Sequence, residues 1–287
     1  MVKGKIEHVF VVMFENRSFD HMLGFSNIQG INALTGEPTT IEGIDNPEKY
    51  AVQDPRNNGK MIMPSPDAPF SIKIDPPHEF KDTLLQLTAQ KINYSPGPYP
   101  SINNKGFALS YLSCNPNSPG ENMKCFSESQ LPILHQLARE FTICDHWHSS
   151  VPGPTWPNRF FLHAATSGGL DDSPNKELTS EASFKEEFNF QNGTIFDQLS
   201  KHNIPWIIYE GDEFSQSYSL KGMHDYGERG HLRPFRKFKH DLSDPKFKPA
   251  YIFIEPCYGY VLTDKGSFKC GNSQHPLDDV RRGEKLL

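Results

Sequence analysis

The stretch HVFVVMFENRSFDHMLG, residues 8–24, decides the fold. It begins with the apolar run VFVVMF, residues 9–14, which predicts a strand buried on both faces of an α/β sheet. The run ends abruptly in polar residues, beginning with Glu15 and Asn16. Ligands of open α/β sheets bind at the carboxyl ends of the strands, so we expect a site here. Ser18 is positioned to cap a short helix that follows.

The composition is that of a globular protein and argues against nucleic acid as a partner. Hydrophobic residues make up 36% of the 287 residues and charged residues 22%, while 24 Pro and 21 Gly indicate many loops. We expect one domain over residues 1–287. The net charge of −6 means that an anionic substrate must be met by a local positive site. The basic and aromatic residues of 231–248 favour a solvated surface over nucleic-acid contact, and contact with anionic lipid headgroups is a third option.

Signals for export and membrane insertion are absent from the sequence. Residues 1–7 lack the order of a secretory signal, and no apolar run approaches transmembrane length. These features predict a cytoplasmic protein, or a secreted one if the N-terminus was trimmed. Five cysteines without a CxxC motif favour reduced thiols, although the pairs Cys114/Cys125 and Cys257/Cys270 could each close a loop in an exported protein.

Helical and strand patterns alternate along the chain. Helices are expected at residues 81–89, 130–141, 194–202 and 278–287. Strands are expected at residues 9–14, 141–144, 206–209 and 250–255, and residues 25–75 and 92–122 are expected to be loops. The alternation predicts an α/β fold with a mostly parallel central sheet and helices on both faces.

A second decisive stretch is VPGPTWPNRFFLHAATSGG, residues 151–169. Pro157 suits the first turn of a helix, which puts Thr155 at the helix N-terminus. Backbone N–H groups and the helix dipole favour negative charge there, so the position suits a nucleophilic oxygen that carries a phosphoryl group. The alternative is that Thr155 is a simple N-cap. His163, further inside the helix, is expected to be structural.

Several histidines have two readings from the sequence alone. His78, in the segment Asp-Pro-Pro-His, is either a turn histidine or a site residue. His146 and His148 follow the strand expected at residues 141–144. They either pack beside Trp147, or one of them lies near the site.

These stretches resemble one family. Residues 15–24, read as Glu-Asn-Arg-Ser-Phe-Asp-His-x-x-Gly, are similar to the opening motif of the phosphoesterase family. That family contains bacterial phospholipases C, plant non-specific phospholipases C and a group of acid phosphatases. Residues 153–159, Gly-Pro-Thr-x-Pro-Asn-Arg, resemble its nucleophile motif. The segments around His78, Glu255 and His275 are similar to further stretches of the family.

The resemblance implies an alkaline-phosphatase-like fold and a hydrolase of phosphate esters. The reaction it implies is phospholipase C-type cleavage of phospholipids through a phospho-threonine intermediate on Thr155. Glu15, Asn16 and Thr155 are then expected to bind a divalent metal ion such as Ca, Mg, Mn or Zn. His78 or His275 is expected to protonate the leaving alcohol. The expected substrate-binding residues are Asn158, Arg159, His146, His148 and Glu255.

One departure from the family pattern bears on activity. In the family the last helix leads into a strand that ends in an Asp-Glu-His-Gly-Gly-like motif, which supplies further metal-binding carboxylates. The chain ends at Leu287 without it, so the C-terminal third of the pattern is missing. We therefore expect a fold that is incomplete at the C-terminus, with an open sheet edge. An acid phosphatase acting on phosphomonoesters and an inactive truncated homologue are the alternatives, and the oligomeric state stays open.

Overall fold

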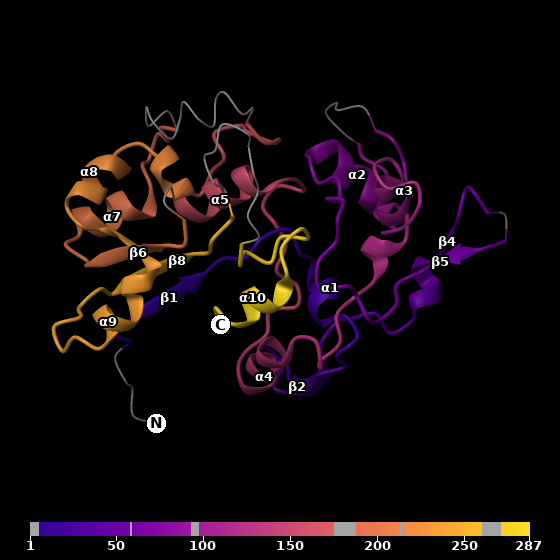
Figure 1. Ribbon diagram of the computed structural model, residues 1–287, viewed down its shortest axis with the longest axis horizontal. Coiled ribbons are helices and arrows are strands. Elements are labelled where there is room, and N and C mark those ends of the chain that lie inside the picture. Colours follow the sequence, from indigo (N-terminus) through magenta and orange to yellow (C-terminus); the bar gives the residue numbers. More distant parts are fainter. Residues whose placement is uncertain (1–5, 58, 93–97, 175–187, 213–214, 260–270) are drawn as a thin grey trace. The chain divides into compact units, whose positions relative to one another are not determined.

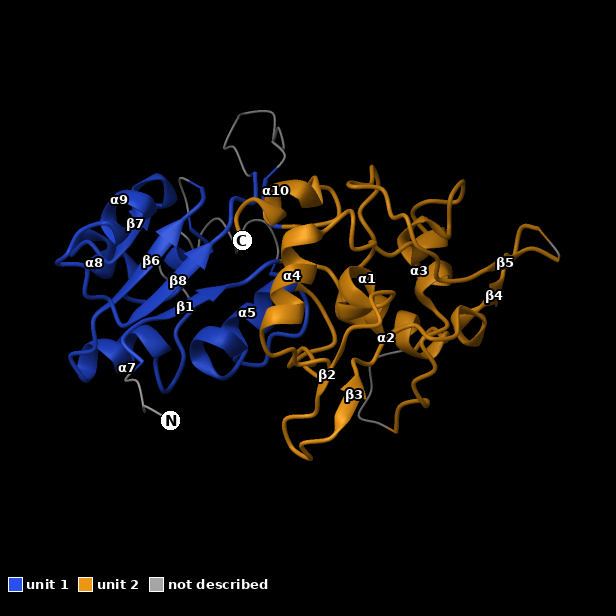
Figure 2. Ribbon diagram, turned by 90° about the horizontal axis from the view of Figure 1, so that it is seen from below, with its two compact units in different colours: residues 1–14, 155–273 blue, residues 15–154, 274–287 orange. Residues whose placement is uncertain are grey.

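The structure is a computed structural model that describes residues 6–57, 59–92, 98–174, 188–212, 215–259 and 271–287 (Figure 1). It contains two compact units, each made of two stretches of chain (Figure 2). Unit 1 comprises Met1–Phe14 and Thr155–Ser273, and unit 2 comprises Glu15–Pro154 and Gln274–Leu287. The expectation of a single domain over residues 1–287 stays a prediction.

Unit 1 is built on a parallel sheet of four strands. In spatial order these are β1 (Val9–Val12), β8 (Tyr251–Glu255), β6 (Trp206–Glu210) and β7 (Leu232–Pro234). All three strand pairings are parallel. The sheet confirms the predicted α/β class.

Helices cover both faces of this sheet. Phe160 of α5 (Thr155–Ala164) and Phe196 of α7 (Ile195–Lys201) pack in one core cluster with Ile208 of β6. The ring of Phe238, in α9 (Phe238–Leu242), lies 5.0 Å from that of Tyr209. Successive residues of a strand point to opposite faces, so the neighbours Ile208 and Tyr209 place α9 on the face opposite α5 and α7. A further helix, α8 (Met223–Glu228), adds Met223 to the cluster.

The first strand is less buried than its sequence predicts. β1 lies at one edge of the described sheet and pairs with β8. Val9 is 46% exposed and Phe10 43% exposed. The prediction of a strand buried on both faces is therefore wrong, because an apolar run does not reveal whether its strand is central or at an edge.

Unit 2 is an assembly of short helices and hairpins. Its helices are α1 (Phe19–Leu23), α2 (Phe80–Thr88), α3 (Phe107–Leu112), α4 (Pro132–Glu140) and α10 (Val280–Glu284). Its strands form the antiparallel pairs β2 (Gln29–Ile31) with β3 (Pro38–Thr40) and β4 (Val52–Gln53) with β5 (Met61–Ile62). Single 3₁₀ turns lie at Pro47–Tyr50 and Glu121–Met123 in unit 2, and at Gln216–Ser219 and Phe235–Lys237 in unit 1. The core of unit 2 includes Met22, Phe126, Leu131 and Val280.

Among the predictions for unit 2, those made from short-range sequence signals were the most successful. The Ser18 side chain accepts a hydrogen bond from the N–H of His21 and caps α1, as expected. The strand expected at residues 141–144 is absent. There the N–H of Phe141 bonds back to the Leu137 carbonyl and closes α4, and the Phe141 side chain is 70% exposed. The expectation of loop at 92–122 missed α3, whose residues pack against α2.

Two further findings concern the cysteines and membrane insertion. Cys114 and Cys125 are free thiols, as expected, while the pair Cys257/Cys270 lies partly outside the described residues. Burial raises the pKa of the Cys125 thiol to about 12, so this thiol is unreactive at neutral pH. Within the described ranges, no helix has the length and apolar character needed to cross a bilayer.

Candidate active site

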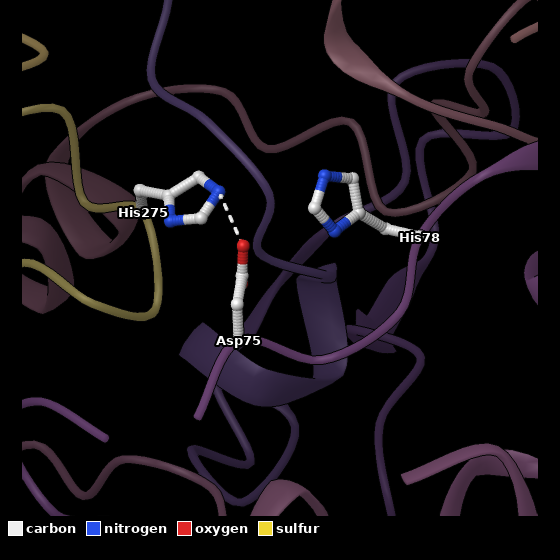
Figure 3. A group of neighbouring side chains, drawn as sticks. All are labelled: Asp75, His78 and His275. Atoms are coloured by element: carbon white, nitrogen blue, oxygen red, sulfur yellow. Dashed lines mark ion pairs between the residues drawn. The ribbon is translucent and has the colours of Figure 1, made fainter. Parts of the chain in front are cut away.

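Three side chains of unit 2 form a compact group: Asp75, His78 and His275 (Figure 3). Asp75 and His78 lie in the segment that leads into α2, and His275 lies in the turn before α10. One nitrogen or carboxylate oxygen from each residue lies within 4.8 Å of the others. His275 Nε2 is 3.5 Å from Asp75 Oδ2, and the two imidazole rings meet edge to face at 5.7 Å. The fold thus brings together two histidines that the sequence had named separately.

Burial dominates the electrostatics of this group. It raises the pKa of Asp75 to about 6, against the lowering effect of the positive charges of His78 and Arg17. Burial, followed by the charges of His78 and Arg17, lowers the pKa of His275 to about 4. At neutral pH, Asp75 is therefore a carboxylate and His275 a neutral imidazole.

Asn16 of the opening motif lies next to the group of Asp75, His78 and His275. Its Nδ2 lies 3.4 Å from Nδ1 of His78, and that nitrogen is 2.7 Å from the carbonyl oxygen of Pro76. Because a carbonyl only accepts, Nδ1 of His78 carries the hydrogen and Nε2 is left to exchange protons. Asn16 has a φ of +45°, in the left-handed region. Asparagine tolerates that region better than most residues, and such conformations concentrate at functional sites.

Donor type alone would let Asp75, His78 and His275 hold a transition metal. The nearby Arg17 opposes this, because its positive charge acts on both Asp75 and His275. A fixed guanidinium repels a cation and attracts phosphate oxygens. The charge of Arg17 therefore weighs against a cation at this group. For a hard divalent cation, the opening motif offers the carboxylate of Glu15 and the amide oxygen of Asn16, the residue whose Nδ2 lies near His78.

Thr155 is the first residue of α5, in unit 1. Buried Arg159 lies 3.8 Å from buried Glu255 at the end of β8, and the ring of His163 lies 4.9 Å from that of Phe253. These two contacts show that α5 runs antiparallel to β8. Its N-terminus, with Thr155, therefore lies toward the carboxyl edge of the sheet. The end of β1 lies at the same edge, because β1 pairs in parallel with β8.

Glu255 and Arg159 belong to a buried polar network. Besides Arg159, the Glu255 carboxylate accepts hydrogen bonds from the Ser215 hydroxyl, from the Gln216 N–H at 3.1 Å and from the Tyr258 hydroxyl at 3.4 Å. The Arg159 guanidinium lies over the Tyr258 ring at 5.3 Å. Burial raises the pKa of Glu255, against the lowering effect of Arg159. The network fixes α5 to the end of β8. A substrate-binding role for either residue stays a prediction.

The remaining predicted residues lie elsewhere. Asn158 is half-buried near the start of α5. His146 and His148 lie on an exposed turn, with their rings 6.4 Å apart, and His146 Nε2 is 2.9 Å from a Glu42 carboxylate oxygen. Their roles stay predictions, as does the meeting of Glu15 and Asn16 with Thr155, which belongs to the other unit.

Two residues of the site were missed by sequence reasoning. Asp75 lies three residues before His78, so its spacing could have suggested a role. Arg17 lies inside the opening motif, but nothing in the sequence links it to the turn at His275, more than 250 residues away.

Comparison with known proteins supports the α/β fold class and shows the family. Residues 6–287 match the model of the Phosphoesterase family. The chain is 34% identical to non-specific phospholipase C1 and 32% identical to non-specific phospholipase C6 of Arabidopsis thaliana, over 100% and 99% of its length. It is 27% identical, over 71% of its length, to a non-hemolytic phospholipase C of Burkholderia pseudomallei (strain K96243). The chain therefore belongs to the phosphoesterase family.

The match covers only part of these relatives. The chain spans about half the length of the plant proteins, 48% and 49%, and 26% of the bacterial one. The unmatched part of these relatives is therefore larger than the third that the motifs suggested.

Proposed function

We propose that this chain carries the substrate-binding and nucleophilic part of a phosphate-ester hydrolase of the phospholipase C type. The observation that carries the proposal is the convergence of Asp75, His78 and His275 beside the opening motif in unit 2. The similarity to plant non-specific phospholipases C along the whole chain supports the substrate class.

In the proposed reaction Thr155 is the nucleophile. Its hydroxyl proton passes to solvent, from which it is regained in the second step. The hydroxyl oxygen bonds to phosphorus, and the bond from phosphorus to the glycerol oxygen breaks. The N-terminus of α5 favours the negative charge on the phosphoryl oxygens. Water then attacks the phospho-threonine, which releases the phosphorylated headgroup and restores the hydroxyl. The diacylglycerol leaves in the first step.

Proton transfer falls to His78. Its Nδ1 is engaged by the Pro76 carbonyl, so Nε2 gives a proton to the leaving glycerol oxygen and takes one from water in the second step. Asp75 supplies a negative charge beside His78. Neutral His275 and the positive Arg17 suit the phosphate oxygens.

A divalent cation fits the donors Glu15 and Asn16, with Thr155 as a proposed third ligand. When bound, such an ion supplies positive charge that lowers the pKa of a coordinated hydroxyl and stabilises charge on phosphoryl oxygens. The metal's identity is not fixed by these donors, because calcium, magnesium and manganese all accept oxygen ligands.

The test compares Thr155→Ala with Thr155→Ser in the full-length protein. We expect Thr155→Ala to lose at least about a thousandfold in turnover with its fold intact, because the nucleophile is gone. Thr155→Ser keeps a hydroxyl and should retain more activity. Circular dichroism checks the fold, and hydrolysis of p-nitrophenyl phosphorylcholine, with and without chelator, measures turnover. Wild-type activity in Thr155→Ala would remove Thr155 from the mechanism.

A second substrate distinguishes the reaction classes. p-Nitrophenyl phosphate is a monoester, and p-nitrophenyl phosphorylcholine is a diester that carries a lipid headgroup. Preference for the diester supports the phospholipase C type. Preference for the monoester would instead favour an acid phosphatase, and inactivity on both in the full-length protein an inactive homologue.

A further inference from the structure

We propose that Arg17 is a positioning residue whose guanidinium fixes the turn that presents His275 to Asp75. The role in turnover rests on the proposed function, whereas the fixing of the turn does not. Arg17 Nε donates a hydrogen bond of 2.7 Å to the carbonyl of Gln274, the residue immediately before His275. This bond holds the peptide group that joins Gln274 to His275.

The turn needs holding because its backbone is strained. Gln274 has a φ of +65°, in the left-handed region that non-glycine residues avoid. Its side chain is nevertheless buried and lies against α10, where a Cβ added to Gly283 would come within 2.2 Å of Gln274 Cγ. A conformation of this kind persists only where the surroundings impose it.

Arg17 itself contacts two further side chains. Its guanidinium lies over the Phe126 ring at 5.3 Å, and Nη1 is 3.3 Å from Nε2 of His21. Burial lowers the pKa of Arg17 to about 10, while the charges of Asp278 and Asp75 raise it. The group therefore stays protonated at neutral pH. A lysine ammonium cannot make these contacts together, because it is a compact point charge rather than a planar fork.

Three backbone hydrogen bonds report on the turn. The N–H of Asp278 donates to the His275 carbonyl at 2.7 Å. The N–H of Ile72 donates to the Pro276 carbonyl at 3.0 Å, and that of Val280 donates to the Phe70 carbonyl at 2.9 Å. If the turn loosens, hydrogen exchange at these three amides should rise, while exchange at an amide of the same unit outside this contact network should not. The N–H of Asp54, which donates to the Lys60 carbonyl at 2.8 Å beside the β4–β5 pair, is such an amide.

The experiment pairs Arg17→Lys with Arg17→Gln. Lysine keeps the charge but has no donor at the position of Nε, whereas glutamine keeps an N–H donor one bond beyond Cδ and loses the charge. We expect Arg17→Lys to raise exchange at the three reporter amides about tenfold or more, and Arg17→Gln to raise it less. Arg56→Lys is the matched control, since Arg56 makes a two-point contact with Asp54 in the same unit.

Each outcome decides the proposal. Wild-type protection in Arg17→Lys, a larger rise in Arg17→Gln, or a uniform rise across unit 2 would overturn it. If Arg17→Lys does not fold, Arg17→Gln alone is compared with wild type: a rise in exchange confined to the three reporter amides supports the proposal, and wild-type protection or a uniform rise overturns it. In the full-length protein, Arg17→Lys should also lower kcat more than it raises KM. Wild-type protein inactive on both p-nitrophenyl substrates would overturn the proposed function and leave the exchange result standing.

Discussion

His163 lies inside α5 among aromatic rings, as expected for a structural histidine. It is 2% exposed, and the ring of Phe196 lies 5.2 Å away. Within the described residues neither of its ring nitrogens has a hydrogen-bond partner. Burial, followed by the charge of Arg159, lowers the pKa of His163 to about 3. An imidazole that has lost its hydration without gaining partners should cost stability.

We therefore expect His163→Phe to raise the free energy of unfolding by about 1–3 kcal/mol. The gain should grow in acid. Because the folded pKa of about 3 lies below the ordinary 6.5, the unfolded state binds more protons, and wild-type stability falls as the pH drops from 6.5 toward 3. Urea unfolding at about pH 7.5 and about pH 5 measures both effects. Equal stability and an equal pH slope in the variant would contradict this account.

At the scale of elements, α4 is capped by a residue from the far end of the chain. Its first flanking residue, Leu131, has no side-chain acceptor. The buried Glu284 carboxylate of α10 instead accepts hydrogen bonds from the N–H of Ile133 at 2.8 Å and of Leu134 at 3.2 Å. The negative charge also suits the positive end of the helix dipole.

Removing this cap should destabilise the protein. We expect Glu284→Ala to lower the free energy of unfolding by about 1–2 kcal/mol, the cost of an N-cap, and Glu284→Gln, which keeps an oxygen acceptor, to lower it less. Thr194→Ala, which removes the local cap of α7, provides the matched control. Urea unfolding compares the three. No loss in Glu284→Ala beside a clear loss in Thr194→Ala would show that α4 does not depend on this contact.

At the scale of the whole molecule, a net charge of −6 makes an anionic substrate dependent on local positive groups. The described structure provides Arg17 at the cluster, and the proposed cation at Glu15 and Asn16 would add to it. A ligand that binds only the folded state stabilises it, by about 2.7 kcal/mol at a hundred times its Kd. Metal binding is therefore visible in thermal unfolding even without turnover.

We expect one of Ca, Mg, Mn or Zn to raise the Tm of the wild-type protein and a chelator to reverse the rise. Glu15→Gln should abolish the rise, because it removes the charged donor, while Asp75→Asn should preserve it. Differential scanning calorimetry with each ion measures the shift. The opposite pattern, a rise that survives in Glu15→Gln and disappears in Asp75→Asn, would move the metal to Asp75, His78 and His275.

The sequence by itself determined many of the local elements, and the family. β6, β8, α2 and α7 are where their residues predict, and Ser18 caps α1, because strand periodicity and helix caps depend on neighbours a few residues apart. The motifs at residues 15–24 and 153–159 were long enough to indicate the phosphoesterase family, to which the chain belongs. The segments around His78 and His275, which resemble further stretches of the family, selected these two histidines.

Only the tertiary structure decided which of these elements and residues meet. It placed β1 at an edge of the sheet, replaced the expected strand at 141–144 with an exposed turn and joined Asp75 to the two histidines. It also brought Arg17 to the Gln274 carbonyl. Contacts between residues so far apart in sequence arise from packing and chain closure. They leave no periodicity or spacing in the sequence from which they could be read.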